Sequence, residues 1–321
     1  MSLSSLNAPP LVAALSAGTF SLIPWLNQTF TSGATSWTVI KGANLAAYGL
    51  SAISVSRPGR YDGQDARDKK ASEGMEKLSS GKRGLSLVPP AGWAFVIWAP
   101  IFLGELVMVG SLLNLSESSP VAPIVRQMTG PYVAAQVFQT LWTASFRPKY
   151  QGRFKFVSAI NLSGIAYSLS LCHKAYAESP TKPYATTDYW IYFLPISLHF
   201  GWTTAASLVN WNGMVAMEER VSAVTVAWLG HASAIAAAVT GVVVTWNRSA
   251  PVYGGVIAWA LAAVASGLSR RIQESEKEDA NRVGVYGAGN QRILCLMGAF
   301  LCAGTSLSVS LIGKKHLSRG H

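Results

Sequence analysis

Charged side chains are scarce in this chain. They make up 13% of its residues, against about 25% in soluble globular domains. Hydrophobic residues account for 50% of the chain. So little charge and so much apolar surface do not suit a fully aqueous fold, and they indicate a protein that lies largely within a lipid bilayer.

Cysteine is also rare in this chain, and the common catalytic motifs are absent. The three cysteines, Cys172, Cys295 and Cys302, all lie in or at the end of apolar runs, so we expect small packing side chains and no disulfide framework. The chain contains no Gly-x-Ser-x-Gly, no phosphate-binding loop and no His-Glu-x-x-His. The sequence therefore predicts no catalytic residue and no metal-binding set of residues.

The net charge of +11 raises the question of an acidic partner. Of the 26 lysines and arginines, 18 fall at residues 57–83, 147–155, 220 and 270–292, in alternate loops between apolar runs. Basic residues collect in the loops that stay on the cytoplasmic side of a membrane protein. Topology and anionic lipid headgroups thus account for the charge, and we expect no nucleic-acid partner.

Several runs have the length and low charge of transmembrane helices, which need about 20 apolar residues to cross the hydrocarbon core. They cover residues 37–56, 94–113, 132–146, 156–173, 190–216, 221–246, 253–268 and 293–312. The sequence predicts an all-α, multi-pass membrane bundle of about eight transmembrane helices, within a range of roughly seven to nine.

The ends of the chain differ from its middle. Residues 1–33 hold an apolar segment, 9–27, that lacks the basic start of a secretory signal. Residues 9–27 are compatible with three interpretations: an interfacial helix, a ninth transmembrane helix or an atypical targeting segment. We favour the interfacial helix. We expect residues 34–269 to form the bundle, with a polar loop at 57–88, and residues 270–321 to form a polar linker and a last transmembrane helix.

One apolar run carries a single carboxylate. After two prolines and Trp93, the run contains Trp98 and, seven residues later, Glu105, which places these two side chains on one helical face. A carboxylate within hydrocarbon is not expected to face lipid. This face is therefore predicted to lie inside the bundle, where Glu105 either pairs with Lys41 or contacts a ligand.

Three segments carry a family pattern: Pro89-Pro-Ala-Gly-Trp-Ala-Phe-Val-Ile-Trp98, Gln139-Thr-Leu-Trp142 and Pro195-Ile-Ser-Leu-His-Phe-Gly-Trp-Thr-Thr-Ala-Ala-Ser-Leu-Val-Asn210. In this order they resemble the second, third and fifth helices of the TspO/MBR family, the tryptophan-rich sensory proteins related to the translocator protein. The resemblance covers about residues 34–216. It implies a TspO-like helical core, often dimeric, that binds tetrapyrroles or sterol-like lipids.

The chain departs from the family pattern in two ways. Typical members have five helices, whereas this chain has additional apolar runs after residue 216. The sterol-recognition pattern expected after Asn210 is missing, because Trp211-Asn-Gly-Met follows and no tyrosine precedes Arg220. The resemblance therefore favours a porphyrin or haem as the ligand over a sterol.

The predicted ligand-binding residues are Trp93, Phe95, Trp98, Glu105, Trp142, His199, Trp202 and Asn210. Indole rings offer flat apolar surfaces to a planar ligand, while Glu105 and Asn210 supply polar contacts that orient it. His199 is either an axial ligand to haem iron or, as we favour, a hydrogen-bonded packing residue. Tryptophans near the ends of the apolar runs, such as Trp246 and Trp259, are expected either at the membrane interface or in helix packing.

Three kinds of function are compatible with these features. The favoured one is an integral membrane protein that binds, transports or senses a flat hydrophobic ligand such as a tetrapyrrole or lipid. The first alternative is a structural or assembly subunit of a larger membrane complex, and the second is a membrane enzyme acting on a tetrapyrrole or lipid. The expected partners are the lipid bilayer, a small hydrophobic ligand, and a second copy of the chain or other membrane subunits.

Overall fold

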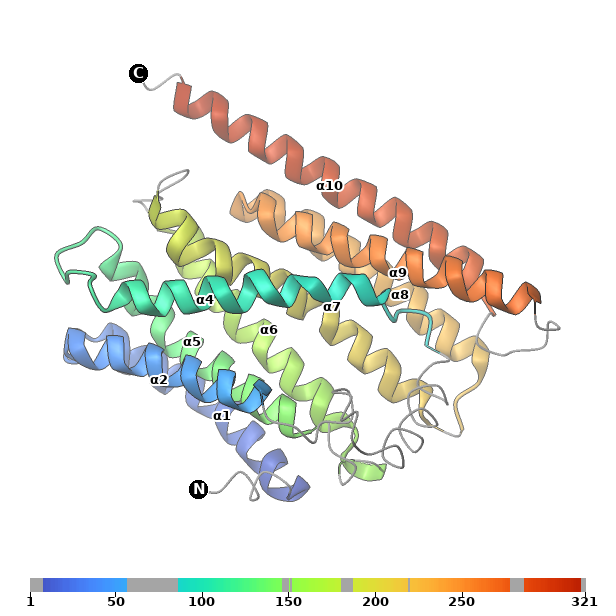
Figure 1. The fold of residues 1–321 in the computed structure, drawn as a ribbon, viewed down its shortest axis with the longest axis horizontal. Helices are drawn as coiled ribbons and strands as arrows, with labels where there is room; N and C mark the ends of the chain where they lie inside the picture. Colours follow the sequence, from blue (N-terminus) through green and yellow to red (C-terminus); the bar gives the residue numbers. More distant parts are fainter. Residues whose placement is uncertain are drawn as a thin grey trace. The chain divides into compact units, whose positions relative to one another are not determined.

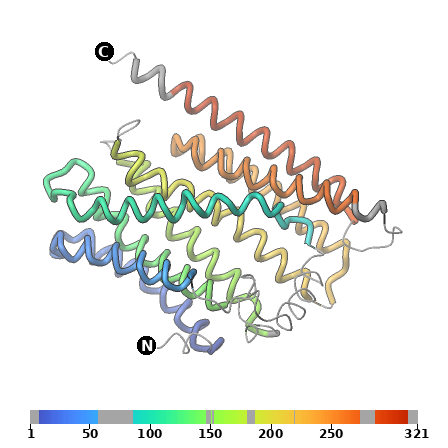
Figure 2. Tube along the Cα trace, viewed as in Figure 1, coloured from blue at the N-terminus to red at the C-terminus, as the bar shows by residue number. Residues whose placement is uncertain are grey.

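The computed structural model describes residues 8–56, 86–145, 150, 152–179, 187–218, 220–277 and 286–318. This part of the chain is helical and contains no β-strand (Figure 1, Figure 2). The α-helices are α1 (Pro9–Thr31), α2 (Trp37–Ser56), α4 (Trp98–Leu112), α5 (Ala122–Ala144), α6 (Phe156–Ala177), α7 (Leu194–Ala216), α8 (Ala223–Arg248), α9 (Pro251–Lys277) and α10 (Ala288–Ser318). The prediction of an all-helical bundle is confirmed.

Short helices of other types precede three of these elements. The 3-10 helix η3 (Gly92–Ile97) runs directly into α4, η5 (Gly152–Phe154) precedes α6, and the π-helix η6 (Tyr189–Phe193) leads into α7. Pro195 is the second residue of α7 and lies just after this π-helical turn.

Six helical segments are long and apolar enough to cross a membrane: Pro9–Thr31, Gly92–Leu112, Phe156–Ala177, Ala223–Arg248, Pro251–Gln273 and Ala288–Ile312. The other three helices are α2, α5 and α7. Their lengths of 20, 23 and 23 residues are similar to those of the six segments, but they contain more polar side chains. Most of α5 is buried, so its polar groups meet protein instead of lipid. The protein is a multi-pass integral membrane protein.

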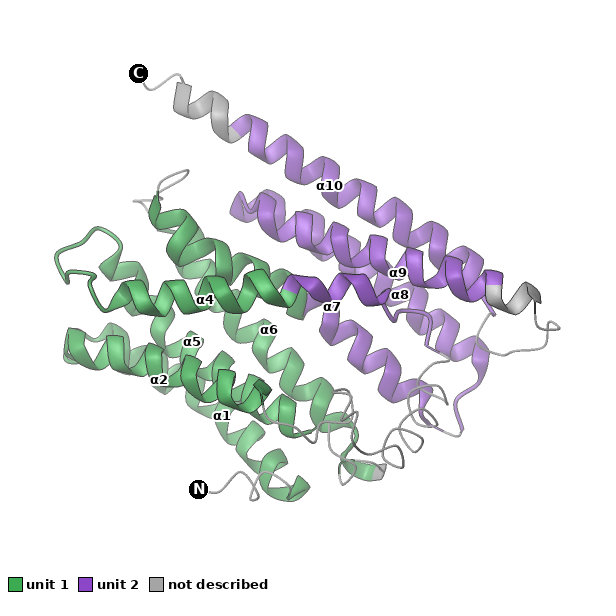
Figure 3. Cartoon of the chain, viewed as in Figure 1, with its two compact units in different colours: residues 1–72, 98–203 green, residues 73–97, 204–321 purple. Residues whose placement is uncertain are grey.

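The described chain divides into two compact units (Figure 3). Unit 1 comprises Met1–Ser72 and Trp98–Thr203, and unit 2 comprises Glu73–Ile97 and Thr204–His321. The chain thus passes from one unit to the other between η3 and α4 and again within α7. The sequence-based prediction divided the chain by other boundaries, into residues 1–33, 34–269 and 270–321.

Helix α5 is the central element of unit 1, because it packs against α1, α2 and α6. Two buried hydrogen bonds join neighbouring helices there. Ser16 Oγ of α1 donates to Asn161 Oδ1 of α6 over 2.7 Å, and Asn44 Nδ2 of α2 donates to Thr129 Oγ1 of α5 over 2.9 Å. Such contacts between helices replace the hydrogen bonds that water cannot supply within a membrane.

The apolar segment near the N-terminus forms one continuous helix, α1. Prolines occupy its first turn and Pro24 lies inside it. The crossing of α1 and α5 is close, since a Cβ atom added to Gly130 would lie 2.8 Å from the backbone nitrogen of Asn27. Although an interfacial helix was favoured for this segment, α1 has the length and composition of a transmembrane helix and packs against α5 and α6.

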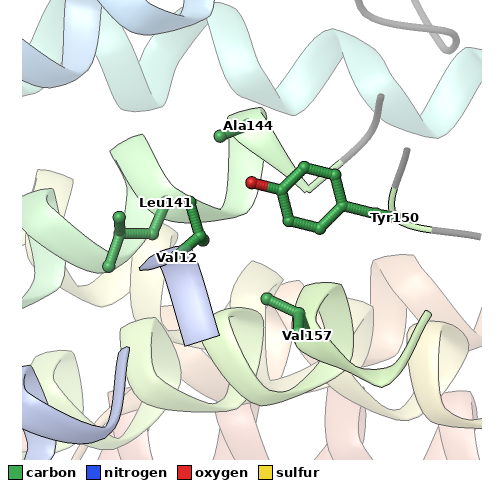
Figure 4. Packing of buried hydrophobic residues seen from close by; sticks show 5 residues of the cluster. All are labelled: Val12, Leu141, Ala144, Tyr150 and Val157. Carbon is green, nitrogen blue, oxygen red and sulfur yellow. The ribbon is translucent and has the colours of Figure 1, made fainter. Parts of the chain in front are cut away.

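A small cluster of buried apolar residues joins α1, α5 and α6 (Figure 4). It brings together Val12 of α1, Leu141 and Ala144 of α5, and Val157 of α6 around the ring of Tyr150. Tyr150 is 1% exposed. The cluster therefore ties α1 to the ends of α5 and α6 through apolar contacts.

In unit 2, helix α10 packs along both α8 and α9. Small residues permit this approach: a Cβ atom added to Gly241 of α8 would lie 2.5 Å from the Cys302 sulfur of α10, and one added to Gly254 of α9 would meet the hydroxyls of Thr245 and Ser306. Close backbone approach through small residues is the usual way in which membrane helices associate. The three cysteines are buried and free, in agreement with the predicted packing role.

Candidate functional site

The site begins with the face of α4 that carries Trp98, Phe102 and Glu105. The rings of Trp98 and Phe102 stack with their centroids 5.4 Å apart. Glu105, one turn further on, is fully buried. The spacing of these residues therefore places an aromatic pair next to a buried carboxylate, and the predicted inward orientation of Glu105 agrees with the structure.

Glu105 accepts hydrogen bonds from three side chains of unit 1. The Tyr132 hydroxyl and Gln136 Nε2, both on α5, donate to Oε2 over 3.2 and 2.8 Å. His199 Nδ1 on α7 lies 2.6 Å from Oε1. Three donors around one carboxyl group match its ionised form, which only accepts hydrogen bonds. The contacts thus compensate for burying a charge away from water.

The alternative partner of Glu105, Lys41, lies elsewhere. Lys41 Nζ donates to the backbone carbonyl of Leu113 over 2.9 Å and is exposed. Lys41 sits in the first turns of α2, from which a long side chain reaches the polar end of the helix bundle. The Lys41 to Glu105 pair is therefore not formed, and His199 takes its place.

Three tryptophans meet beside this carboxylate. The Trp98 ring lies nearly parallel to that of Trp142, with a centroid distance of 6.2 Å and an interplanar angle of 28°. It lies edge-on to Trp202, at 6.3 Å and 85°, and to His199, at 5.6 Å and 74°. Trp142 and Trp202 are buried, whereas Trp98 is half-buried. We call Trp98, Trp142, Trp202, Glu105 and His199 the indole cluster.

Two buried polar atoms of this region have no hydrogen-bond partner in the described part of the chain: His199 Nε2 and Gln136 Oε1. Both belong to side chains that hold Glu105 through their other polar atom. In the tautomer of a neutral imidazole whose Nδ1 donates to the carboxylate, Nε2 carries a free electron pair. Buried polar atoms are usually satisfied, so these two stand out beside the carboxylate.

The structure places Trp93 and Phe95 in unit 2. The Trp93 ring lies edge-on to Trp259 of α9 at 4.6 Å, and its Nε1 donates to Ser266 Oγ over 3.4 Å. The backbone is held as well, because Ala91 N donates to the carbonyl of Ala263 over 2.9 Å. The side chain of Phe95 is 50% exposed. Trp93 and Trp259 thus attach the proline-rich segment to α9, a packing role that was not predicted for Trp93.

Asn210 also belongs to unit 2. Its Nδ2 donates to the carbonyl of Ala206, one turn earlier in α7, over 3.3 Å. The structure therefore brings five of the eight predicted residues into the indole cluster and leaves Trp93, Phe95 and Asn210 outside unit 1.

Two residues that contact Glu105 were missed by the sequence analysis, Tyr132 and Gln136. They are four residues apart on α5 and so share a helical face. Gln139 and Thr143, both buried polar side chains, continue this helix towards its end. The spacing of these polar residues is visible in the sequence, but the burial of their face is known only from the structure.

A second histidine, His231 of α8, has a packing role in unit 2. Its Nδ1 lies 2.6 Å from Gln291 Oε1 of α10, and Gln291 Nε2 donates to the carbonyl of Gly230 over 3.0 Å. Next to His231, Gly287 has a φ of +75°, which favours glycine. These contacts fasten the beginning of α10 to α8.

These features define a class: an all-helical, multi-pass integral membrane protein with a histidine–carboxylate pair buried among tryptophans. Comparison with models of protein families identifies the family. The family model described as TSPO-like protein matches residues 73–278, and the chain belongs to this family. The match extends from before η3 to the end of α9. No curated protein and no solved structure matches the chain.

Proposed function

We propose that the protein binds a flat hydrophobic ligand, such as a tetrapyrrole or a lipid of similar shape, at the indole cluster. One observation carries this proposal: tryptophans from α4, α5 and α7 converge on a buried polar pair that retains an unsatisfied nitrogen. Membership of the TSPO-like family supports it. Transport or sensing of the ligand would use the same site.

The physical basis of binding is the removal of apolar surface from water, worth about 25 cal/mol per Å² before the costs of ordering. Trp98 is the half-buried member of the cluster, so it is the ring that a ligand meets first. Trp142 and Trp202 are 8% and 3% exposed and form the inner surface. The polar atoms of His199 and Gln136 then orient the ligand, as few but well-placed polar groups do in apolar pockets.

The test is a titration of the purified protein with protoporphyrin, followed by porphyrin absorbance and by quenching of tryptophan fluorescence. We expect Trp98→Ala and Trp202→Ala to weaken binding about tenfold or more, as the loss of a central aromatic contact does in other binding sites. Trp246→Ala is the matched control, because Trp246 is 58% exposed on α8.

Circular dichroism and size-exclusion chromatography verify that each variant keeps its helices and its size. Equal losses of affinity in all three variants, or no binding by the unchanged protein, would reject the assignment of the site to the indole cluster.

A further inference from the structure

Glu105 carries a buried negative charge that no lysine or arginine offsets. Its side chain is 0% exposed and lies in a segment that is apolar enough to cross a membrane. The titratable groups close to it are Tyr48 of α2, Tyr132 of α5, Cys172 of α6 and His199 of α7. Among the described residues, no lysine or arginine contacts it. A charge held in hydrocarbon without a counter-charge is costly, and such residues often mark proton pathways.

The surroundings of His199 keep its imidazole neutral. An imidazolium has two N–H donors and needs an acceptor for each of them. Nδ1 lies 2.6 Å from Glu105 Oε1, but the buried Nε2 has no acceptor in the part of the chain that the structure describes. An N–H of a charged ring without an acceptor costs more than the free electron pair of a neutral ring. The pair therefore keeps the charge of its carboxylate, and a proton that neutralises the pair belongs on Glu105.

Local packing explains why these two side chains meet. A Cβ atom added to Gly104 of α4 would lie 2.8 Å from Cγ of Pro195 of α7, so the two helices approach closely at the residue before Glu105. His199 follows Pro195 by one turn and therefore shares its face of α7. Gln136 Nε2 of α5 donates to Oε2 of the same carboxylate over 2.8 Å. The carboxylate is thus fixed by two other helices in one position, where it can receive a proton.

A small cavity in unit 1 leads to this carboxylate. Its volume is about 10 Å³, which is about the space that one water molecule needs. Tyr132 forms part of its wall and donates its hydroxyl to Glu105 Oε2 over 3.2 Å. The polar side chains of Asn44 and Tyr192 also line the cavity, together with four apolar ones. Tyr132 therefore connects a place for water with the buried carboxylate.

The polar side chains towards the other end of α5 offer no comparable route. The hydroxyls of Thr140 and Thr143 donate to backbone carbonyls of their own helix over 3.0 and 2.8 Å, and the amide of Gln139 has no group that ionises. The cavity lies where α4 ends and α5 begins, because Leu112 and Val125 line it. A proton is therefore expected to reach the carboxylate from this end of unit 1.

We propose that Glu105 is a proton-binding site that is reached from the cavity through Tyr132. A hydronium ion in the cavity gives a proton to the Tyr132 oxygen, while the Tyr132 hydroxyl gives its own proton to Glu105 Oε2. The carboxylate becomes a carboxyl group, and a water molecule is left in the cavity. His199 is a positioning residue, because its Nδ1 holds the other carboxylate oxygen. The inference goes beyond the proposed function and does not depend on it, since every measurement below uses the protein without an added ligand.

The proton also affects the indole cluster. A hydrogen bond to an ionised acceptor is roughly twice as strong as one to a neutral acceptor, so the bond from His199 Nδ1 weakens when Glu105 is protonated. The imidazole lies edge-on to Trp98, with the ring centroids 5.6 Å apart. The emission of an indole depends on the charges beside it. Tryptophan fluorescence therefore follows the protonation of Glu105 and provides an optical readout.

The first experiment records infrared difference spectra of the unchanged full-length protein in lipid nanodiscs as the pH is lowered. A protonated carboxyl group has its own C=O stretching band, and its frequency differs between buried and exposed groups. We expect one band from a buried carboxyl group, which is lost in Glu105→Gln and changes frequency in Glu105→Asp. Glu117→Gln is the matched control and should keep the band, because Glu117 is exposed and pairs with Arg126.

Two results of this experiment would overturn the proposal. One is that no buried carboxyl band forms at any pH at which the protein stays folded. The other is that an imidazolium signal from His199 forms in place of the band. If Glu105→Gln does not fold, the band of the unchanged protein and its change in Glu105→Asp decide.

The second experiment tests the route. After a rapid drop in pH, the infrared band and the tryptophan emission change at the rate at which the proton arrives. Tyr132→Phe keeps the ring but removes the hydroxyl, so it should slow this change about tenfold or more, while the band still forms. Tyr48→Phe is the matched control, because the Tyr48 hydroxyl donates to the carbonyl of Phe102 over 2.9 Å. Equal rates in the unchanged protein and in both variants would overturn the route through Tyr132.

Discussion

Glu105 is a fully buried carboxylate in the middle of a transmembrane helix, and its neighbours explain how it is tolerated. Tyr132, Gln136 and His199 each give it one hydrogen bond. Removing one partner of a buried pair leaves a charge without compensation, which costs about 3–5 kcal/mol, whereas replacing both partners by apolar groups of similar size costs far less.

A double-mutant cycle on Glu105 and His199 follows from this reasoning. We expect His199→Leu alone to lower the free energy of unfolding by about 3 kcal/mol, and Glu105→Leu with His199→Leu to cost less than the sum of the two single changes. Unfolding in a graded detergent mixture, followed by circular dichroism, provides the measurement. Strictly additive effects would mean that the two side chains do not interact.

The sequence predicted part of this site. The seven-residue spacing of Trp98 and Glu105 placed both on one face of α4, and the structure agrees. The partner of Glu105 could not be predicted, because Lys41 and His199 were both available and the choice depends on which helix packs against α4. Tyr132 and Gln136 were missed for a similar reason: polar residues on an apolar helix mark a buried face only once the neighbouring helices are known.

Helix α5 was predicted to exist, but the residue at which it begins was not predicted correctly. The apolar run was expected at residues 132–146, directly after Pro131. In the structure α5 begins at Ala122 and continues through Pro131. Prolines are tolerated in membrane helices because neighbouring groups satisfy the freed carbonyl. Helix α2, which contains no proline, has the predicted bounds of 37–56.

The crossing of α1 and α5 gives a prediction with a matched control. Gly130→Ala should lower the thermal stability of the protein, because the new methyl group would meet the backbone of Asn27 at 2.8 Å, and backbone cannot move aside as a side chain can. Gly49→Ala on α2 adds the same atom where nothing lies within 4 Å, and it should be neutral or stabilise by up to about 1 kcal/mol through helix propensity. Thermal unfolding of both variants checks this, and equal melting temperatures would contradict the close crossing.

The two compact units of the molecule contain different helices and different candidate residues. Unit 1 contains the indole cluster, while unit 2 contains α8, α9 and α10 together with the proline-rich segment that the resemblance placed at the ligand. The family match includes α8 and α9 but not α1, α2 or α10. The sequence predicted the apolar runs but not the two units, because the attachment of residues 89–97 to α9 depends on contacts between distant segments, such as Trp93 with Trp259. Residues 57–85, most of the predicted polar loop at 57–88, lie outside the described residues.

The charge distribution predicts the orientation of the molecule in its membrane. The turn between α4 and α5 has no basic residue, whereas residues 270–292 carry five. Five helices, α5 to α9, separate that turn from the end of α9, so we expect the turn and residues 270–292 on opposite sides, with residues 270–292 on the cytoplasmic side. Ser118→Cys and Asn281→Cys, labelled with a maleimide that does not cross membranes, should react from opposite faces. The native cysteines are buried and give little background. Labelling of both positions from the same face would contradict this topology.

The central claim is that a flat ligand binds among Trp98, Trp142 and Trp202, and light-driven oxidation tests it most directly. Illuminated protoporphyrin converts dissolved oxygen to a species that oxidises nearby indoles, and mass spectrometry of the digested protein then identifies the modified residues. With one protoporphyrin per protein, the account predicts oxidation mainly at the three cluster tryptophans. Oxidation that instead follows exposure, greatest at Trp228 and Trp190, which are 69% and 61% exposed, would contradict it.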